Sequence, residues 1–218
     1  MTPAAKDFRV FWDNAYVVHD LYDGGEKLLN VFEEAKKYGN EDMFYIFVST
    51  SKISFPGSGL AAFASSKKNI EHALSKIKIQ TIGPDKLNQL RHARMFPNLE
   101  AIHEHMREHS ALLRPKFEAV LDVLERELSG LEIGSWMHPR GGYFISFDSL
   151  DGCAKNIVAK AKEAGLIMTP AGATFPYGKD PKDSNIRIAP SLPPVEELAL
   201  AMDVFCTCLK LAALEKLM

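Results

Sequence analysis

The stretch FYIFVSTSK, residues 44–52, decides the fold of this chain. Phe44 to Val48 are apolar without alternation, which is typical of a strand covered on both faces. A second apolar run, Phe8 to Trp12, ends in Asp13 and also predicts a strand. Between the two runs, residues 26–38 carry apolar side chains at helical spacing and predict a helix. The sequence therefore predicts a β-α-β unit, whose crossover is long enough for parallel pairing.

Downstream of this unit the pattern changes. Residues 60–64 predict an antiparallel strand, because the connection of about ten residues before them is too short for a helical crossover. Helices are expected at 67–79, 84–94 and 98–128, the last interrupted at Pro115. An α+β module should follow, with strands at Trp136, 142–147, 166–169 and 185–189 and helices at 153–163 and after Pro193-Pro194.

The fold class predicted is α/β with two domains, at about 1–114 and about 115–218. A chain of 218 residues has length enough for both, since each domain can then bury a core of its own.

The composition excludes several classes of function. With 26 Lys and Arg against 28 Asp and Glu, the net charge of −2 gives no general attraction to nucleic acid, so a small-molecule partner is expected. Three cysteines, Cys153, Cys206 and Cys208, are too few for a disulfide framework, and the expected compartment is the reducing cytoplasm. The sequence has no apolar run of about 18 residues, so no membrane span is expected.

The ends of the two predicted parallel strands carry chemically useful side chains. Ligands bind beyond the carboxyl ends of such strands. Ser49, Ser51 and Lys52 follow one strand, and Asp13 and Tyr16 follow the other. A partly desolvated lysine has its charged form disfavoured, and its neutral amine can form a Schiff base with an aldehyde. Hydroxyls can bind a phosphate, a carboxylate can hold a pyridine nitrogen protonated, and a phenol can bond the ring oxygen. Together these groups predict a pyridoxal phosphate site.

Five short motifs occur in order along the chain. They are Asp13-Asn14-Ala15-Tyr16, Ser49 to Lys52, Pro56-Gly57, Gly141-Gly142-Tyr143-Phe144, and Arg187 within Asn185 to Ala189. With these motifs the sequence resembles the class I/II aminotransferases, which are pyridoxal phosphate enzymes of fold type I. Within this family, the segments Trp-Asp-Asn-Ala-Tyr and Ser-Thr-Ser-Lys-Ile-Ser-Phe-Pro-Gly resemble those of the MocR-like branch, which includes aspartate aminotransferases.

The resemblance implies a role for each matched residue. Lys52 would form the Schiff base with pyridoxal 5'-phosphate and move the proton between the substrate and the cofactor. Asp13 would pair with the pyridinium nitrogen, Tyr16 with the 3-oxygen, Ser49 and Ser51 with the phosphate, and Arg187 with the substrate α-carboxylate. The implied activity is transfer of an amino group to a 2-oxo acid, with aspartate and 2-oxoglutarate as the expected pair. A homodimer is implied as well.

The chain departs from the family pattern in two ways. Gly59 stands where family members generally carry an arginine that binds the cofactor phosphate. The first half of the large domain, which in the family supplies other cofactor contacts, is not matched. We therefore expect the C-terminal part of the large domain plus an intact small domain. Such a chain would expose an unpaired sheet edge and an uncovered sheet face, and by itself it would bind the cofactor weakly or not at all.

Three alternatives stay open. The chain could be the effector domain of a MocR-type transcription regulator, or an inert remnant of an aminotransferase. His105 and His109, with His103 nearby, stand four residues apart on one predicted helix and could bind zinc. Their order does not give the H-E-x-x-H pattern, and helical histidines are more often solvated or dimer-contact residues, so no metal is expected.

Overall fold

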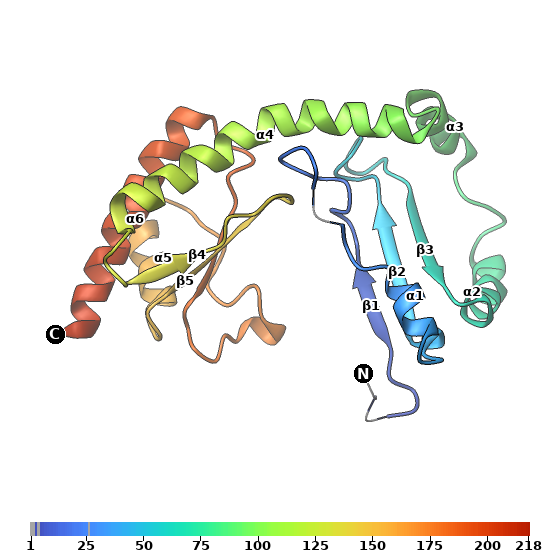
Figure 1. Ribbon diagram of the computed structural model, residues 1–218, viewed down its shortest axis with the longest axis horizontal. Helices are drawn as coiled ribbons and strands as arrows, with labels where there is room; N and C mark the ends of the chain where they lie inside the picture. Colours follow the sequence, from blue (N-terminus) through green and yellow to red (C-terminus); the bar gives the residue numbers. More distant parts are fainter. Residues whose placement is uncertain (1–2, 4, 26) are drawn as a thin grey trace. The chain divides into compact units, whose positions relative to one another are not determined.

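The computed structural model describes residues 3, 5–25 and 27–218, and their contacts divide the chain into two compact units. The first unit holds the described residues of 1–18 and 26–106, and the second holds 19–25 and 107–218. Within the described residues, each unit contains one three-stranded sheet (Figure 1). The contact division falls inside the long helix α4, Leu99–Leu128, and the domain boundary near residue 114 stays a prediction.

The first unit is a small mixed sheet with short helices. Its strands run in the order β1-β2-β3, with β1 parallel and β3 antiparallel to β2, which confirms both pairing predictions. The elements are β1 (Val10–Asp13), α1 (Val31–Lys36), the 3-10 turn η1 (Glu41–Met43), β2 (Phe44–Ser49), β3 (Ala61–Ser65), α2 (Lys67–Gln80), α3 (Lys86–Met95) and the start of α4.

The strand register sets the position of the candidate site. Asp13, the last residue of β1, lies opposite Phe47 of β2, and the Asn14 N–H donates to the Phe47 carbonyl oxygen at 2.8 Å. Ser49, the last residue of β2, lies opposite Ala61 of β3. Because β1 and β2 are parallel, their polar carboxyl ends meet at the same edge of the sheet.

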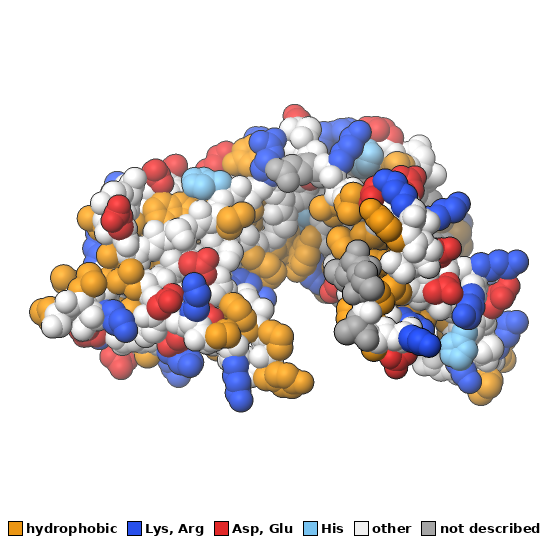
Figure 2. All heavy atoms as spheres, turned by 60° about the horizontal axis from the view of Figure 1, so that its bottom comes forward, with side chains coloured by type: hydrophobic (Ala, Val, Ile, Leu, Met, Phe, Trp, Pro, Cys, Tyr) orange, Lys and Arg blue, Asp and Glu red, His pale blue; other side chains and the backbone are white. Residues whose placement is uncertain are grey.

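One face of this sheet carries a row of aromatic side chains. The ring of Phe11 lies 5.6 Å from Tyr45 and 5.7 Å from Phe47, and Phe47 lies 6.1 Å from Phe63. Phe11 is 72% exposed and Phe47 is 38% exposed. The described residues therefore do not cover β2 on both faces, and the uncovered face expected for such a chain is present. Figure 2 shows hydrophobic side chains at the surface of the molecule.

The second unit packs three helices around an antiparallel sheet in the order β4-β5-β6 (Figure 1). Phe117 of α4, Phe147 of β5 and Phe205 of α6 are fully buried in its core, where the rings of Phe147 and Phe205 meet edge to face at 5.2 Å. The elements that follow α4 are β4 (Gly134–Trp136), β5 (Ile145–Ser149), α5 (Ala154–Glu163), the 3-10 turn η2 (Pro176–Gly178), β6 (Asn185–Ile188) and α6 (Val195–Leu217).

Several predicted elements differ from the structure. The strand expected at 166–169 is wrong: Leu166 and Met168 pack against the core while Ile167 is 85% exposed, but no strand pairs with this segment. A break in α4 at Pro115 is also wrong, because the helix continues through this residue, whereas a kink at Pro115 stays a prediction. Among the described residues, α1 begins only after Asn30, whose side-chain oxygen accepts from the Phe32 and Glu33 N–H groups. Glu26, the first residue of that predicted helix, lies outside the described residues.

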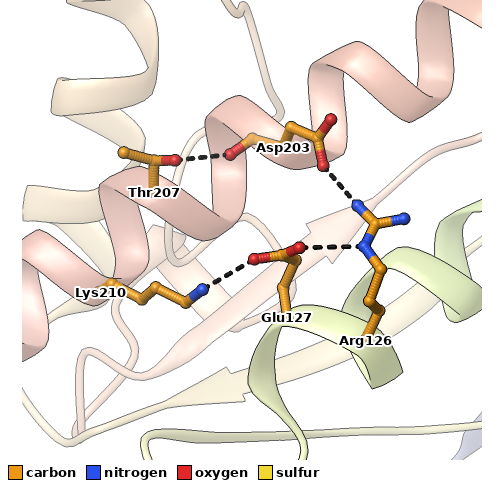
Figure 3. Close-up of polar contacts among 5 residues, drawn as sticks. All are labelled: Arg126, Glu127, Asp203, Thr207 and Lys210. Carbon is orange, nitrogen blue, oxygen red and sulfur yellow. Dashed lines mark hydrogen bonds and ion pairs between the residues drawn. The ribbon is translucent and has the colours of Figure 1, made fainter.

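An ion-pair network joins α4 to α6 (Figure 3). Arg126 donates to Asp203 at 2.7 Å and to Glu127 at 2.9 Å, and Lys210 donates to Glu127 at 2.8 Å. The hydrogen bonds from Lys210 and then Arg126 hold the pKa of the Glu127 carboxyl below its ordinary value. Among the described helices, none is long and apolar enough to cross a membrane.

Candidate functional site

Lys52 lies in a tight turn directly after β2. The Ile53 and Ser54 N–H groups donate to the Thr50 carbonyl oxygen at 2.9 and 2.8 Å, so the backbone closes on itself around Lys52. Ser49 and Ser51 lie on the approach to this turn, with their hydroxyl oxygens 2.8 Å apart. The Ser51 N–H also donates to the Ser49 hydroxyl oxygen at 3.0 Å.

The structure brings the other strand end to the same place. The Lys52 ammonium lies 5.3 Å from the centre of the Tyr16 ring. Asp13 accepts from the Ala15 N–H at 3.2 Å, which fixes the turn between Asp13 and Tyr16. Asp13 and Ser49 line one cavity of about 280 Å³ at the sheet edge. All five residues expected from the strand ends therefore belong to one region of the first unit.

Lys52 differs from the expectation in one respect. Its side chain is exposed, so the described residues do not by themselves remove the amine from water. Asp13 is exposed as well. A bound ring between the two groups would be needed to desolvate them.

Gly59 packs directly against the serine pair. A Cβ atom added at Gly59 would lie 2.9 Å from both the backbone nitrogen and the hydroxyl oxygen of Ser51. Contacts that short require a shift of the Ser51 backbone. The position where the family resemblance expects an arginine therefore has no room for any side chain in this arrangement.

Sequence reasoning missed the residues that support the turn. His92 of α3 is buried, and its Nε2 lies 2.8 Å from the Ser54 hydroxyl and 3.1 Å from the Thr50 hydroxyl. His105 of α4 lies with its Nε2 2.7 Å from the Ile53 carbonyl oxygen. His92 gave no sequence signal beyond its place in a predicted helix. For His105 the sequence indicates only a zinc ligand or a solvated or dimer-contact residue.

Arg187 lies on β6 of the second unit, opposite Ser146 of β5. Its guanidinium carbon lies 4.5 Å from the centre of the Phe144 ring, a stacking contact that orients the planar group. Its Nε atom is buried and has no hydrogen-bond partner among the described residues. A buried donor without a partner is costly, and a bound carboxylate could satisfy it.

The other candidates from the sequence were histidines and cysteines. Within the described part of the chain, no three His, Cys, Asp or Glu side chains lie together so as to hold one metal ion. All three cysteines are free and buried. Burial raises the pKa of the Cys206 thiol to about 12, which suits a packing residue and not a nucleophile.

The fold and the lysine turn define the class of this protein. A mixed sheet whose parallel strands end in an aspartate and in a serine-lysine turn, followed by an α+β unit, has the arrangement of the pyridoxal phosphate-dependent transferases of fold type I. The family comparison is more specific. A protein-family model described as "Aspartate amino-transferase" matches residues 1–218, and the chain belongs to this family of pyridoxal phosphate-dependent aminotransferases.

Individual relatives agree with the family match. An aspartate aminotransferase of Corynebacterium glutamicum is 46% identical over 215 residues, covering 99% of this chain and 50% of that protein. The crystal structure of an aspartate transaminase of Corynebacterium glutamicum has a TM-score of 0.95 at 45% identity and covers 99% of this chain and 51% of its own. The chain thus spans about half the length of the relatives it matches.

More distant structures share the fold. An α-aminoadipate aminotransferase of Thermus thermophilus, complexed with N-(5'-phosphopyridoxyl)-L-leucine, has a TM-score of 0.73 at 22% identity. The match covers 94% of this chain and 50% of that chain.

Proposed function

We propose that this chain carries the cofactor lysine of an aminotransferase that moves an amino group from aspartate to a 2-oxo acid such as 2-oxoglutarate. The observation that carries this proposal is the geometry of the strand ends. Lys52 lies 5.3 Å from the Tyr16 ring, and Asp13 and Ser49 line one cavity. Family membership and the matched aspartate aminotransferase support the reaction class.

The residues of the first unit fit pyridoxal 5'-phosphate. Once bound, the cofactor supplies an electron-poor ring that accepts negative charge from the substrate's α-carbon. Lys52 holds it through its Nζ atom and afterwards moves a proton at that nitrogen. Asp13 holds the proton on the pyridine nitrogen, because a carboxylate beside it favours the charged form. The Tyr16 hydroxyl donates a hydrogen bond to the ring's 3-oxygen.

The serine pair is suited to donate to the phosphate. Since the Ser51 N–H occupies the Ser49 oxygen, the Ser49 hydroxyl can donate to Ser51 at 2.8 Å. The Ser51 hydroxyl hydrogen is then available to a bound oxygen. Gly59 keeps this arrangement by leaving the space beside Ser51 empty. Loop N–H groups supply the rest of the phosphate contacts in this proposal.

Arg187 is the proposed binder of the substrate α-carboxylate. A planar guanidinium forms two parallel hydrogen bonds with a carboxylate, and its stacking on Phe144 fixes the plane of the fork. The buried, unpartnered Nε supports this role. The proposed preference for aspartate rests on the segments that resemble the MocR-like branch and on the name of the Corynebacterium glutamicum relative, aspartate aminotransferase. A homodimer in the cytoplasm is part of the same proposal.

Covalent trapping tests this function. The chain is incubated with pyridoxal phosphate and reduced with borohydride, and the tagged lysine is located by mass spectrometry. The Lys52→Ala variant should lose the tag, Asp13→Asn should weaken it, and Lys67→Ala, at an exposed lysine of α2, should leave it unchanged. Aspartate added before reduction should lower the tag on Lys52 more than leucine does. Equal tagging of wild type and the Asp13→Asn variant, with no effect of aspartate, would refute the proposal.

Two further predictions concern the extent and the role of the chain. That the chain is the C-terminal portion of an aminotransferase stays a prediction. So does the alternative of a MocR-type effector domain or an inert remnant. The trapping experiment separates the catalytic proposal from an inert remnant, because only a working site should lose tag on Lys52 when aspartate is added before reduction.

A further inference from the structure

Two histidines from two different helices contact the turn that carries Lys52. His92 comes from α3 and His105 comes from α4, and both belong to the first unit. Neither reaches the cavity lined by Asp13 and Ser49. Their contacts are with the residues on either side of Lys52 along the chain.

The tautomer of His92 follows from the hydrogen-bond partners of its two ring nitrogens. Its Nδ1 lies 2.9 Å from the Asn88 carbonyl oxygen, which can only accept, so Nδ1 carries the hydrogen. In the neutral ring Nε2 is then an acceptor. It faces the Ser54 hydroxyl at 2.8 Å and the Thr50 hydroxyl at 3.1 Å. His92 is only 8% exposed, so these bonds are formed out of water.

Thr50 links His92 to Leu60, at the far end of loop 50–60. Its hydroxyl oxygen accepts from the Leu60 N–H at 2.7 Å, which leaves its own hydrogen to donate to His92. The Thr50 N–H donates to the Leu60 carbonyl oxygen at 2.8 Å. The Asn88 side chain donates to the Gly59 carbonyl oxygen at 3.2 Å. One turn of α3 therefore fastens both ends of loop 50–60.

His105 holds the opposite side of the turn. Its Nε2 donates to the Ile53 carbonyl oxygen at 2.7 Å, and Ile53 directly follows Lys52. The ring also packs 5.2 Å from Phe96, between α3 and α4. With the carbonyl of Ile53 and the hydroxyl of Thr50 both fixed, the backbone of Lys52 has little freedom to rotate.

We propose that His92 and His105 are positioning residues that fix the backbone of Lys52 and so keep its amine above the Tyr16 ring. The inference rests on the proposed function, since it explains how an exposed lysine on a long flexible stem is held ready to react. Preorganisation of this kind reduces the entropy that must be lost when the reacting groups meet.

The test compares alanine and glutamine variants in the chain itself. His92→Ala and His105→Ala remove the contacts, whereas His92→Gln and His105→Gln keep a side-chain oxygen or N–H at a similar distance. His72→Ala on α2 and His103→Ala on α4 are matched controls. The first readout is amide exchange in peptides covering residues 50–60. The second is the acetylation rate of Lys52 relative to Lys67.

Each alanine variant should raise amide exchange in 50–60 by about tenfold, while exchange in α2 stays unchanged. Lys52 acetylation relative to Lys67 should rise about threefold, because the amine is no longer held over Tyr16. The glutamine variants should restore most of both values, and the controls should match wild type. If an alanine variant does not fold, Thr50→Val removes the hydroxyl alone and should raise exchange in the same peptides.

The proposal is overturned if the alanine variants match the controls in both readouts. It is also overturned if exchange rises equally in α2, since that result indicates a general loss of stability. Neither readout needs the cofactor. A chain in which Lys52 is not tagged by pyridoxal phosphate would contradict the proposed function and leave the amide-exchange result intact, so the two failures can be told apart.

Discussion

Replacing Gly59 by alanine should destabilise the first unit far more than a single methyl group usually does. The added Cβ would lie 2.9 Å from the Ser51 nitrogen and hydroxyl oxygen and 3.1 Å from its Cα. Two of these three atoms are backbone, so the clash cannot be relieved by rotating a side chain. Overpacking of this kind costs about 1–3 kcal/mol. At an m-value of about 2 kcal/mol per M, the urea midpoint should fall by about 0.5–1.5 M.

Gly83→Ala is the matched control. Gly83 belongs to the same unit, a Cβ there meets nothing within 4 Å, and its φ is outside the left-handed region. An alanine at a compatible position stabilises by about 0.4–1 kcal/mol through the unfolded chain. The two alanine variants should therefore differ by more than 1.4 kcal/mol, which is a tenfold change in the folding equilibrium.

Urea unfolding of the first unit can be followed separately. The chain has two tryptophans, Trp12 in the first unit and Trp136 in the second. In a Trp136→Phe background, the emission of Trp12 reports the first unit alone. If Gly59→Ala and Gly83→Ala have the same urea midpoint, the argument that Gly59 is required by close packing on Ser51 is refuted.

Three further predictions concern the second unit. Phe147→Ala, at a fully buried ring of the core, should cost about 3–5 kcal/mol in urea unfolding followed by Trp136, and a cost below 1 kcal/mol would contradict the packing described. The pKa of the Glu127 carboxyl is held below its ordinary value of 4.5. The contribution of this carboxylate to the free energy of unfolding is therefore present above about pH 4.5 and is lost as the pH falls through the lowered value. Glu127→Gln should therefore lower stability at pH 7 and flatten the loss on acidification, whereas an unchanged acid profile would argue against the pair with Lys210. Arg187→Lys should raise about tenfold the aspartate concentration that, added before reduction, lowers the tag on Lys52 by half, and an unchanged concentration would exclude Arg187 as the carboxylate binder.

Local sequence patterns predicted much of the fold. The parallel pair β1 and β2 followed from a long crossover, and antiparallel β3 followed from a short one. Local sequence patterns gave wrong predictions where tertiary contacts determine the secondary structure. Residues 166–169 form a short, mainly apolar run that predicts a strand, yet no neighbouring strand pairs with them. Pro115 is accommodated within α4, although local propensity alone favours a break there.

Of the proposed site, the sequence could locate only the groups proposed to react. Asp13 and Lys52 stand at strand ends that the hydrophobic pattern locates, so their place at one edge of the sheet could be expected. The buried hydrogen bonds that support the Lys52 turn could not be predicted from the sequence. His92 lies 42 positions along the chain from Thr50, and a single polar residue in a helix carries no signal of such a distant partner. The close packing of Gly59 on Ser51 is likewise visible only in three dimensions.

The most direct measurement is the location of the borohydride tag after incubation of the chain with pyridoxal phosphate. The side chains of Lys67 and Lys68 are 91% and 83% exposed, so a reaction governed by access alone would label them at least as strongly as Lys52. The account predicts that Lys52 carries more of the tag than Lys67 or Lys68 even where the cofactor binds weakly, and that Lys52→Ala does not redirect the tag to them. A tag spread over the exposed lysines in proportion to their accessibility would contradict the account.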